Sequence, residues 1–216
     1  MRIDFVSDVS CPWCVIGLKS LEQALDKLAH EISVEVHIQP FELNPAMGAE
    51  GQDITEHITE KYGSTPEQLA QSREMIRQRG ADVGFNFEIG KRDRIYNTFD
   101  AHRLLHWAGE HGRQRDLKMG LFEAYFTNGE NPGSHEVLLR VAGEVGLDTG
   151  EAAHVLSTDM YAQEVREAEQ FFQRAGINSV PAVIINQRHL ISGGQAPEVF
   201  EQALRQIAVQ EEDVLS

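Results

Sequence analysis

The two cysteines of this 216-residue chain stand three positions apart, at Cys11 and Cys14 in the segment SDVSCPWC. Ser10 is a good helix-capping residue and Pro12 is well tolerated in a first helical turn, so the pair is predicted to open a helix. Unpaired backbone N–H groups and the helix dipole favour negative charge there, which populates the reactive thiolate near neutral pH. We expect Cys11 to be the exposed attacking thiol, and Cys14, one turn further in and facing the core, to be the resolving thiol.

A zinc site and an inert pair of thiols are the alternatives for these cysteines. A structural zinc site needs four nitrogen or sulfur ligands, and no other cysteine is present. His102 and His106 are four residues apart on one face of a predicted helix, but such a pair is more often packing and solvated surface. A disulfide closing so short a loop would constrain the unfolded chain little, so reactive thiols are favoured over a structural role.

A second feature, Ser179-Val180-Pro181, directly precedes a compact apolar strand predicted over residues 182–185. A proline at that place suits the edge of a sheet, and an X–Pro bond is cis by default in only about one case in twenty. In the predicted topology, however, the start of this strand lies beside the end of the first strand, close to Cys11. A cis peptide there would offer free backbone groups to an extended substrate, so Val180 and Pro181 are expected to bind substrate.

The elements that must position these residues form two short strand-bearing segments around a helical block. The predicted strands are residues 2–7, 32–38, 182–185 and 189–192. The predicted helices are residues 12–28, a helix that starts at 65–67, residues 98–109, 117–126, 137–145 and 151–174, and a last helix from Pro197. The outline is βαβ in residues 1–40, a mainly helical insertion in residues 41–170, and ββα in residues 171–216.

Charge and hydropathy narrow the range of partners. Nineteen Lys and Arg residues against thirty-four Asp and Glu residues give a formal net charge of −15. Such a surplus repels phosphate backbones and anionic lipids, so neither nucleic acid nor a membrane is an expected partner. The chain has no apolar run long enough for a membrane span and none of signal-peptide length at its start, which predicts a cytoplasmic protein.

The chain resembles the DsbA-like branch of the thioredoxin superfamily, and within it the FrnE-like cytoplasmic dithiol–disulfide oxidoreductases. The resemblance covers essentially the whole chain and rests on the segments SDVSCPWC, QPFELNP, AHRLLHWA and SVPAVIINQRHLISGGQ. It implies an α/β thioredoxin fold interrupted by a large all-helical insertion. It also implies that Cys11 attacks, Cys14 resolves and Pro181 is a cis-proline, and that AHRLLHWA is an insertion helix near the active site without a metal.

Two residues beside the cysteines bear on reactivity. Strongly oxidising members of the wider family carry Cys-Pro-His-Cys, whereas Trp13 has no charge to stabilise a thiolate. We expect its indole to form an apolar lip that binds substrate. Asp8 would raise the pKa of a nearby thiol if it pointed inward, but a solvated, turn-forming loop acid is the favoured interpretation.

The leading functional hypothesis is a thiol–disulfide oxidoreductase or isomerase that acts on proteins or small molecules bearing thiols or disulfides. No cofactor beyond its own redox-active cysteines is expected, with glutathione as a possible co-substrate. The main alternative is a glutathione-dependent isomerase or transferase, similar to 2-hydroxychromene-2-carboxylate isomerases and kappa-class glutathione transferases. Those enzymes typically carry serine where Cys11 stands. A third hypothesis is a chaperone-like module without catalysis.

Overall fold

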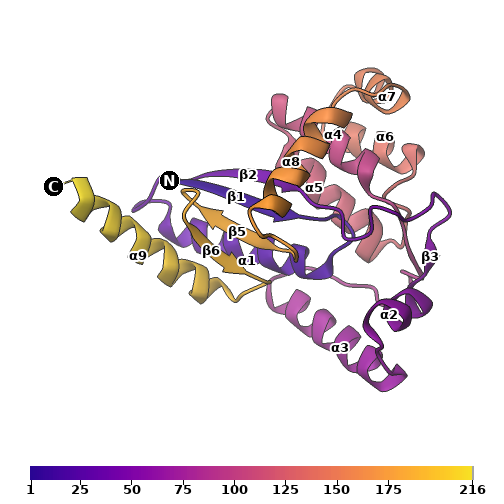
Figure 1. The fold of residues 1–216 in the computed structure, drawn as a ribbon, viewed down its shortest axis with the longest axis horizontal. Helices are drawn as coiled ribbons and strands as arrows, with labels where there is room; N and C mark the ends of the chain where they lie inside the picture. Colours follow the sequence, from indigo (N-terminus) through magenta and orange to yellow (C-terminus); the bar gives the residue numbers. More distant parts are fainter. Residues whose placement is uncertain (216) are drawn as a thin grey trace.

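A four-stranded sheet of order β2-β1-β5-β6 forms the centre of the computed structural model, which describes the backbone of residues 1–215 and the side chains of residues 1–210 (Figure 1). Its strands are β1 (Arg2–Ser7), β2 (Glu35–Pro40), β5 (Ala182–Ile185) and β6 (His189–Ser192). β1 runs parallel to β2 and antiparallel to β5, which pairs antiparallel with β6. The sheet joins the first forty residues to the last part of the chain.

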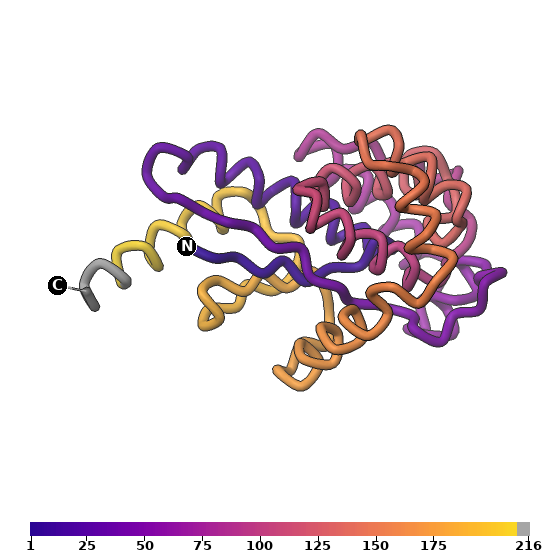
Figure 2. Tube along the Cα trace, turned by 90° about the horizontal axis from the view of Figure 1, so that it is seen from above, coloured from indigo at the N-terminus to yellow at the C-terminus, as the bar shows by residue number. Residues whose placement is uncertain are grey.

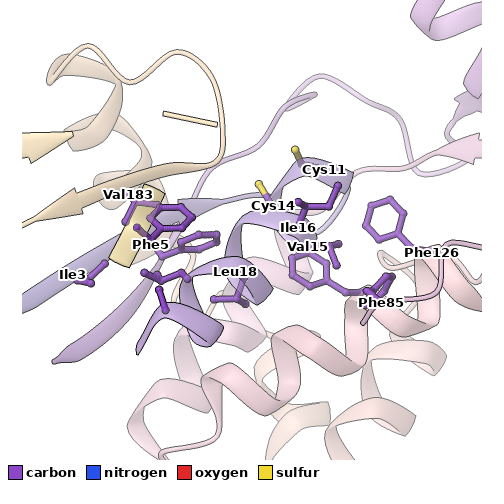
Figure 3. Close-up of a cluster of buried hydrophobic side chains, with 14 of the residues drawn as sticks. Ile3, Phe5, Cys11, Cys14, Val15, Ile16, Leu18, Phe85, Phe126 and Val183 are labelled. Atoms are coloured by element: carbon purple, nitrogen blue, oxygen red, sulfur yellow. The ribbon is translucent and has the colours of Figure 1, made fainter. Parts of the chain in front are cut away.

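Helices cover both faces of this sheet. α1 (Pro12–Leu28) connects β1 to β2 and packs on one face together with α9 (Pro197–Leu215). α8 (Ala162–Arg174) lies on the opposite face, which is clearest in Figure 2. The main core lies between the sheet and the α1/α9 layer and includes Ile3, Phe5, Leu18, Val183 and Phe200, several of which are labelled in Figure 3. The expected βαβ and ββα halves are therefore confirmed.

The insertion between β2 and β5 gathers at the end of the sheet where β1 stops and α1 begins (Figure 1). Before α8 it contains β3 (Gln52–Asp53), α2 (Ile54–Tyr62), α3 (Pro66–Asp82), β4 (Arg94–Ile95), α4 (Phe99–Glu110), α5 (Gln114–Phe122), the π-helical turn η1 (Glu123–Thr127), α6 (His135–Glu144) and α7 (Thr149–Ser157). The regular elements of the insertion are helices apart from β3 and β4, which pair as two-residue strands. The expected boundary between the insertion and the second thioredoxin-fold part, at residue 170, falls inside α8. The last residue of the expected second part, Ser216, lies outside the described residues.

Three predicted elements differ from the expected ones by more than two residues at one end or by a break. β2 begins at Glu35 instead of residue 32, because its partner strand β1 begins at Arg2, which pairs with Glu35. The stretch 117–126 divides into the end of α5 and the start of the π-helical turn. The stretch 151–174 divides into α7 and α8.

The break between α7 and α8 has a tertiary cause. The buried Arg103 side chain of α4 donates hydrogen bonds to the backbone carbonyls of Val155, Thr158 and Met160. These carbonyls lie at the end of α7 and just beyond it, where helical acceptors lose their own partners. The arginine therefore stabilises the helix end, a contact that no local sequence pattern reveals.

Substitution of Gly17 measures how tightly α1 packs against the segment before β5. A Cβ atom at this position would lie 2.9 Å from Cγ of Pro181. Gly17→Ala should therefore lower the free energy of unfolding in urea by about 1 kcal/mol, because overpacking outweighs the gain in helix propensity. The control Gly109→Ala, whose Cβ would meet only the flexible Gln114 side chain at 3.4 Å, should be neutral or stabilising. Equal behaviour of the two variants would contradict the close contact.

Candidate active site around Cys11 and Cys14

Cys11 stands at the junction between β1 and α1. It is the N-cap residue of α1 and has an extended backbone, and Pro12 occupies the first helical position. Its sulfur lies 3.6 Å from the backbone carbonyl oxygen of Val180. Cys11 is only 4% exposed, so the expectation of an exposed thiol is wrong: the Val180 segment and the insertion both lie close to it.

Cys14 lies one helical turn further along α1 and is completely buried. The two cysteines are free thiols, and both come from the start of α1 (Figure 3). Burial raises the pKa of Cys14 well above its usual value, and the hydrogen bond and negative charge of Cys11 raise it further. Lys118 and the backbone of Asp8 act in the opposite direction. The thiolate of Cys14 is therefore scarce in this resting arrangement.

The three residues expected to bind substrate lie around the first cysteine. The Val180–Pro181 peptide bond is cis, and the carbonyl of Pro181 accepts a hydrogen bond of 2.8 Å from the amide of Gly193. Trp13 is half-buried and lies against Gly194, where an added Cβ would come within 3.3 Å of the indole ring. Val180, Pro181 and Trp13 thus lie near Cys11 although they come from the two ends of the chain.

Asp8 differs most from its expected environment. Its carboxylate is 1% exposed and accepts hydrogen bonds from the Leu43 amide at 2.7 Å and from the amide and hydroxyl of Ser10 at 3.2 and 2.9 Å. His102 Nε2 lies 3.4 Å from the carboxylate. Asp8 forms the expected turn but is not solvated, because the loop after β2 and helix α4 cover it.

These contacts reverse the effect of burial on Asp8. Burial alone raises the pKa of a carboxyl group. For Asp8 the adjacent His102, the amide of Leu43 and the charge of Lys118 outweigh burial and lower the pKa to about 2. The carboxylate is therefore ionised at every physiological pH, and it is anchored to the insertion.

Lys118 is a residue of the site that the sequence analysis did not identify. This α5 lysine is fully buried, and its Nζ has no hydrogen-bond partner among the described residues. Nζ lies 5.2 Å from the Phe122 ring centroid and interacts electrostatically with Cys14, Asp8 and Cys11. Burial lowers the pKa of Lys118 to about 8, although these three groups favour its charged form. Its spacing from Phe122 is the one feature of the sequence that could have predicted this burial. Residues four apart share a helix face, and Phe122 is a core residue.

The two histidines of AHRLLHWA have separate partners. No cluster of three or more potential ligands occurs within the described part of the chain. His102 pairs with Asp8, whereas the His106 ring lies 5.0 Å from the Tyr161 ring. Both histidines also line a cavity of about 620 Å³ between α1, β2 and α4, which neither cysteine lines. His102 therefore supports the active-site loop through Asp8.

Asp8 should stabilise the fold in a pH-dependent manner. A carboxyl group whose pKa falls on folding contributes stability above its unfolded pKa, and loses it as the pH falls through the folded value of about 2. We expect Asp8→Asn to lower the free energy of unfolding by about 2 kcal/mol at pH 7 and by about half as much at pH 3. Urea unfolding at both pH values measures this. The exposed α1 acid in Asp26→Asn serves as control, and a loss independent of pH would contradict the assignment.

Comparisons with known proteins agree with this geometry. A family model described as DSBA-like thioredoxin domain matches residues 2–205. A crystal structure of a probable DsbA oxidoreductase from Streptomyces coelicolor is 35% identical and has a TM-score of 0.89, over 95% of this chain and 89% of that one. No helix in the described part of the chain is long and apolar enough to cross a membrane.

Two more distant structures share the fold. The cytosolic disulfide reductase DsbM from Pseudomonas aeruginosa, solved with GSH, is 16% identical with a TM-score of 0.68, over 96% of this chain and 99% of that one. A 2-hydroxychromene-2-carboxylate isomerase is also 16% identical, with a TM-score of 0.69 over the full length of both chains. The family model and the Streptomyces structure decide the assignment: the chain belongs to the DsbA-like thioredoxin family, and it is an enzyme of the disulfide oxidoreductase type.

Proposed function

We propose that this enzyme exchanges thiols and disulfides through Cys11 and Cys14. The contact of the Cys11 sulfur with the Val180 carbonyl, 3.6 Å away, is the observation that carries the proposal. It supports an attacking thiol beside a backbone segment that can hold a substrate, with a second thiol one helical turn further along α1. Val180, Pro181 and Trp13 would form the substrate-binding surface.

In the first step, the thiolate of Cys11 attacks one sulfur of a substrate disulfide RS–SR′. The substrate S–S bond breaks, R′S⁻ leaves and takes up a proton, and a mixed disulfide forms between Cys11 and RS. The N-terminus of α1 favours negative charge on the attacking sulfur, because Cys11 is the N-cap residue and the helix dipole is positive at that end.

In the second step, Cys14 attacks the sulfur of Cys11 and releases RS⁻. The two-electron balance is complete: the enzyme dithiol becomes a disulfide, and the substrate becomes two thiols. Run in reverse, the same steps oxidise a substrate dithiol. The mixed disulfide removes the negative charge and hydrogen bond of Cys11 that raise the pKa of Cys14, so the first step facilitates the second.

Lys118 assists the second step in this proposal. A buried ammonium without a hydrogen bond is costly, and such a cost is commonly retained at functional sites. Its positive charge favours the thiolate of Cys14 just when that thiol must lose its proton. Its lowered pKa of about 8 also permits Lys118 to exchange a proton near neutral pH.

The substrates are proposed to be proteins or small molecules that carry thiols or disulfides, with glutathione as a co-substrate and the cytoplasm as the compartment. A glutathione-dependent isomerase remains the alternative, since such an isomerase shares the fold. An enzyme that only activates glutathione has no need of a resolving thiol, however. The adjacent Cys14 therefore favours redox exchange.

Substitution of each cysteine tests the two roles. Cys11→Ser should abolish exchange with glutathione disulfide, because the attacking thiol is lost. Cys14→Ser should retain the first step and accumulate one glutathionyl group on Cys11, which mass spectrometry after acid quenching detects. Catalysis by Cys11→Ser, or no adduct in Cys14→Ser despite a folded protein, would refute the proposal.

Replacement of Lys118 should separate stability from activity. A lysine whose pKa falls from about 10.5 to about 8 on folding destabilises the folded state below pH 8, and stability rises with pH between those values. Lys118→Met should therefore raise the free energy of unfolding at pH 7 by about 1–3 kcal/mol and remove that pH dependence. The decay of the mixed disulfide should become slower.

The surface variant Lys27→Met controls for loss of one positive charge, because Lys27 forms an exposed ion pair with Glu201. Stability is measured by urea unfolding from pH 7 to 10, and decay by alkylation at timed intervals. A stabilised Lys118→Met variant with unchanged decay of the mixed disulfide would show that Lys118 has no part in the second step.

A further inference from the structure

A small recess lies beside the attacking cysteine, at the beginning of α1. Its wall includes Pro12, the residue after Cys11, together with Arg73, Arg92, Glu88 and Phe126 from the insertion. The recess has a volume of about 20 Å³, which suits a single water-sized group such as one carboxylate oxygen. A group of that size in the recess would belong to a molecule positioned next to the reacting sulfur.

Arg92 lines this recess and has no counterion among the described residues. Its guanidinium carbon lies 5.2 Å from the Tyr125 ring centroid and 4.9 Å from that of Phe126, so aromatic rings hold the group. Its Nη1 atom is buried and has no hydrogen-bond partner among the described residues. A buried guanidinium ordinarily has its N–H groups paired, and here one nitrogen remains available to a ligand.

Arg73 supplies a second positive charge to the same recess. It comes from α3, and its Nη2 donates a hydrogen bond of 3.2 Å to Thr55 Oγ1. Within the described part of the chain, neither Arg73 nor Arg92 forms an ion pair. Glu88 also lines the recess, and its carboxylate accepts a hydrogen bond of 2.8 Å from Asn86 Nδ2.

Two neighbouring arginines without an ion pair among the described residues are unusual in a chain of net charge −15, in which carboxylates outnumber basic side chains. Arg92 also interacts electrostatically with Cys11 and is repelled by Arg73. An incoming anion would relieve this repulsion and satisfy the free nitrogen of Arg92. A carboxylate fits such a site because it accepts charge-assisted hydrogen bonds from guanidinium groups.

We propose that Arg92 and Arg73 bind a carboxylate of the substrate, and that the preferred substrates are small acidic disulfides and thiols of the glutathione class. The inference rests on the proposed exchange at Cys11 and specifies its substrate. The competing role for Arg92 is stabilisation of the Cys11 thiolate, which would accelerate reaction with every disulfide alike. The charge of the substrate therefore distinguishes the two roles.

The test compares one anionic and one neutral disulfide in single turnovers of the reduced full-length enzyme. Glutathione disulfide carries carboxylates, whereas hydroxyethyl disulfide carries no charge. The measured quantity is the ratio of the two second-order rate constants, followed by alkylation quenching and mass spectrometry. Each constant is determined for the wild type, Arg92→Met, Arg92→Lys, Arg73→Met and the control Arg77→Met, which removes an exposed α3 arginine paired with Glu74.

The ratio should fall about tenfold or more in Arg92→Met, which corresponds to loss of a hydrogen bond between charged groups. It should fall less in Arg92→Lys and Arg73→Met, and remain at the wild-type value in Arg77→Met. Arg73→Met and Arg92→Lys keep the test informative if Arg92→Met does not fold.

An unchanged ratio in the Arg92 and Arg73 variants would overturn the carboxylate site, whether the rates with both disulfides are retained or fall together. Failure of the proposed function gives a different result. In that case the wild-type enzyme would react with neither disulfide, and no substitution at the recess would be responsible.

Discussion

The antiparallel pairing of β1 with β5 is the contact on which the rest of the site depends. Val6 pairs with Ala182, so the residues after β1 lie beside the residues before β5. This register brings Cys11 to the Val180 carbonyl across 169 positions of sequence. A shift of one residue would turn the strand side chains to the opposite face and expose Phe5 and Val183. Burial of the core and placement of the thiol are therefore fixed by the same hydrogen-bonded ladder.

Buried charge determines what the site can do. Asp8, Lys118 and Arg92 lie near the cysteines, where low polarity strengthens each electrostatic interaction. Asp8 is fully satisfied by hydrogen bonds and His102, so it anchors the loop that carries Cys11. Lys118 and Arg92 each keep a nitrogen without a hydrogen-bond partner among the residues that the structure describes. Asp8 contributes to stability, whereas Lys118 and Arg92 are the charges to which the proposals above assign roles in the reaction.

The insertion completes the active site as well as covering it. Lys118 comes from α5, His102 from α4 and Arg73 from α3, while Arg92 lies just before β4. The thioredoxin-fold core supplies both thiols and the Val180–Pro181 segment. In the proposed mechanism the chemistry of exchange thus resides in the core, and the charges around it, together with the proposed substrate selectivity, come from the insertion.

The sequence by itself determined the βαβ and ββα halves, the helical character of the insertion, and the CPWC pair at the strand–helix junction, because these follow from local periodicity and short motifs. It also pointed to Val180-Pro181 beside Cys11, since the topology followed from the order of the elements. Tertiary structure decided the start of β2 at the partner of Arg2, the break before α8 beside Arg103, and the burial of Cys11. It also decided the environments of Asp8, Lys118 and Arg92, because burial and the distance between charges depend on segments that are remote in sequence.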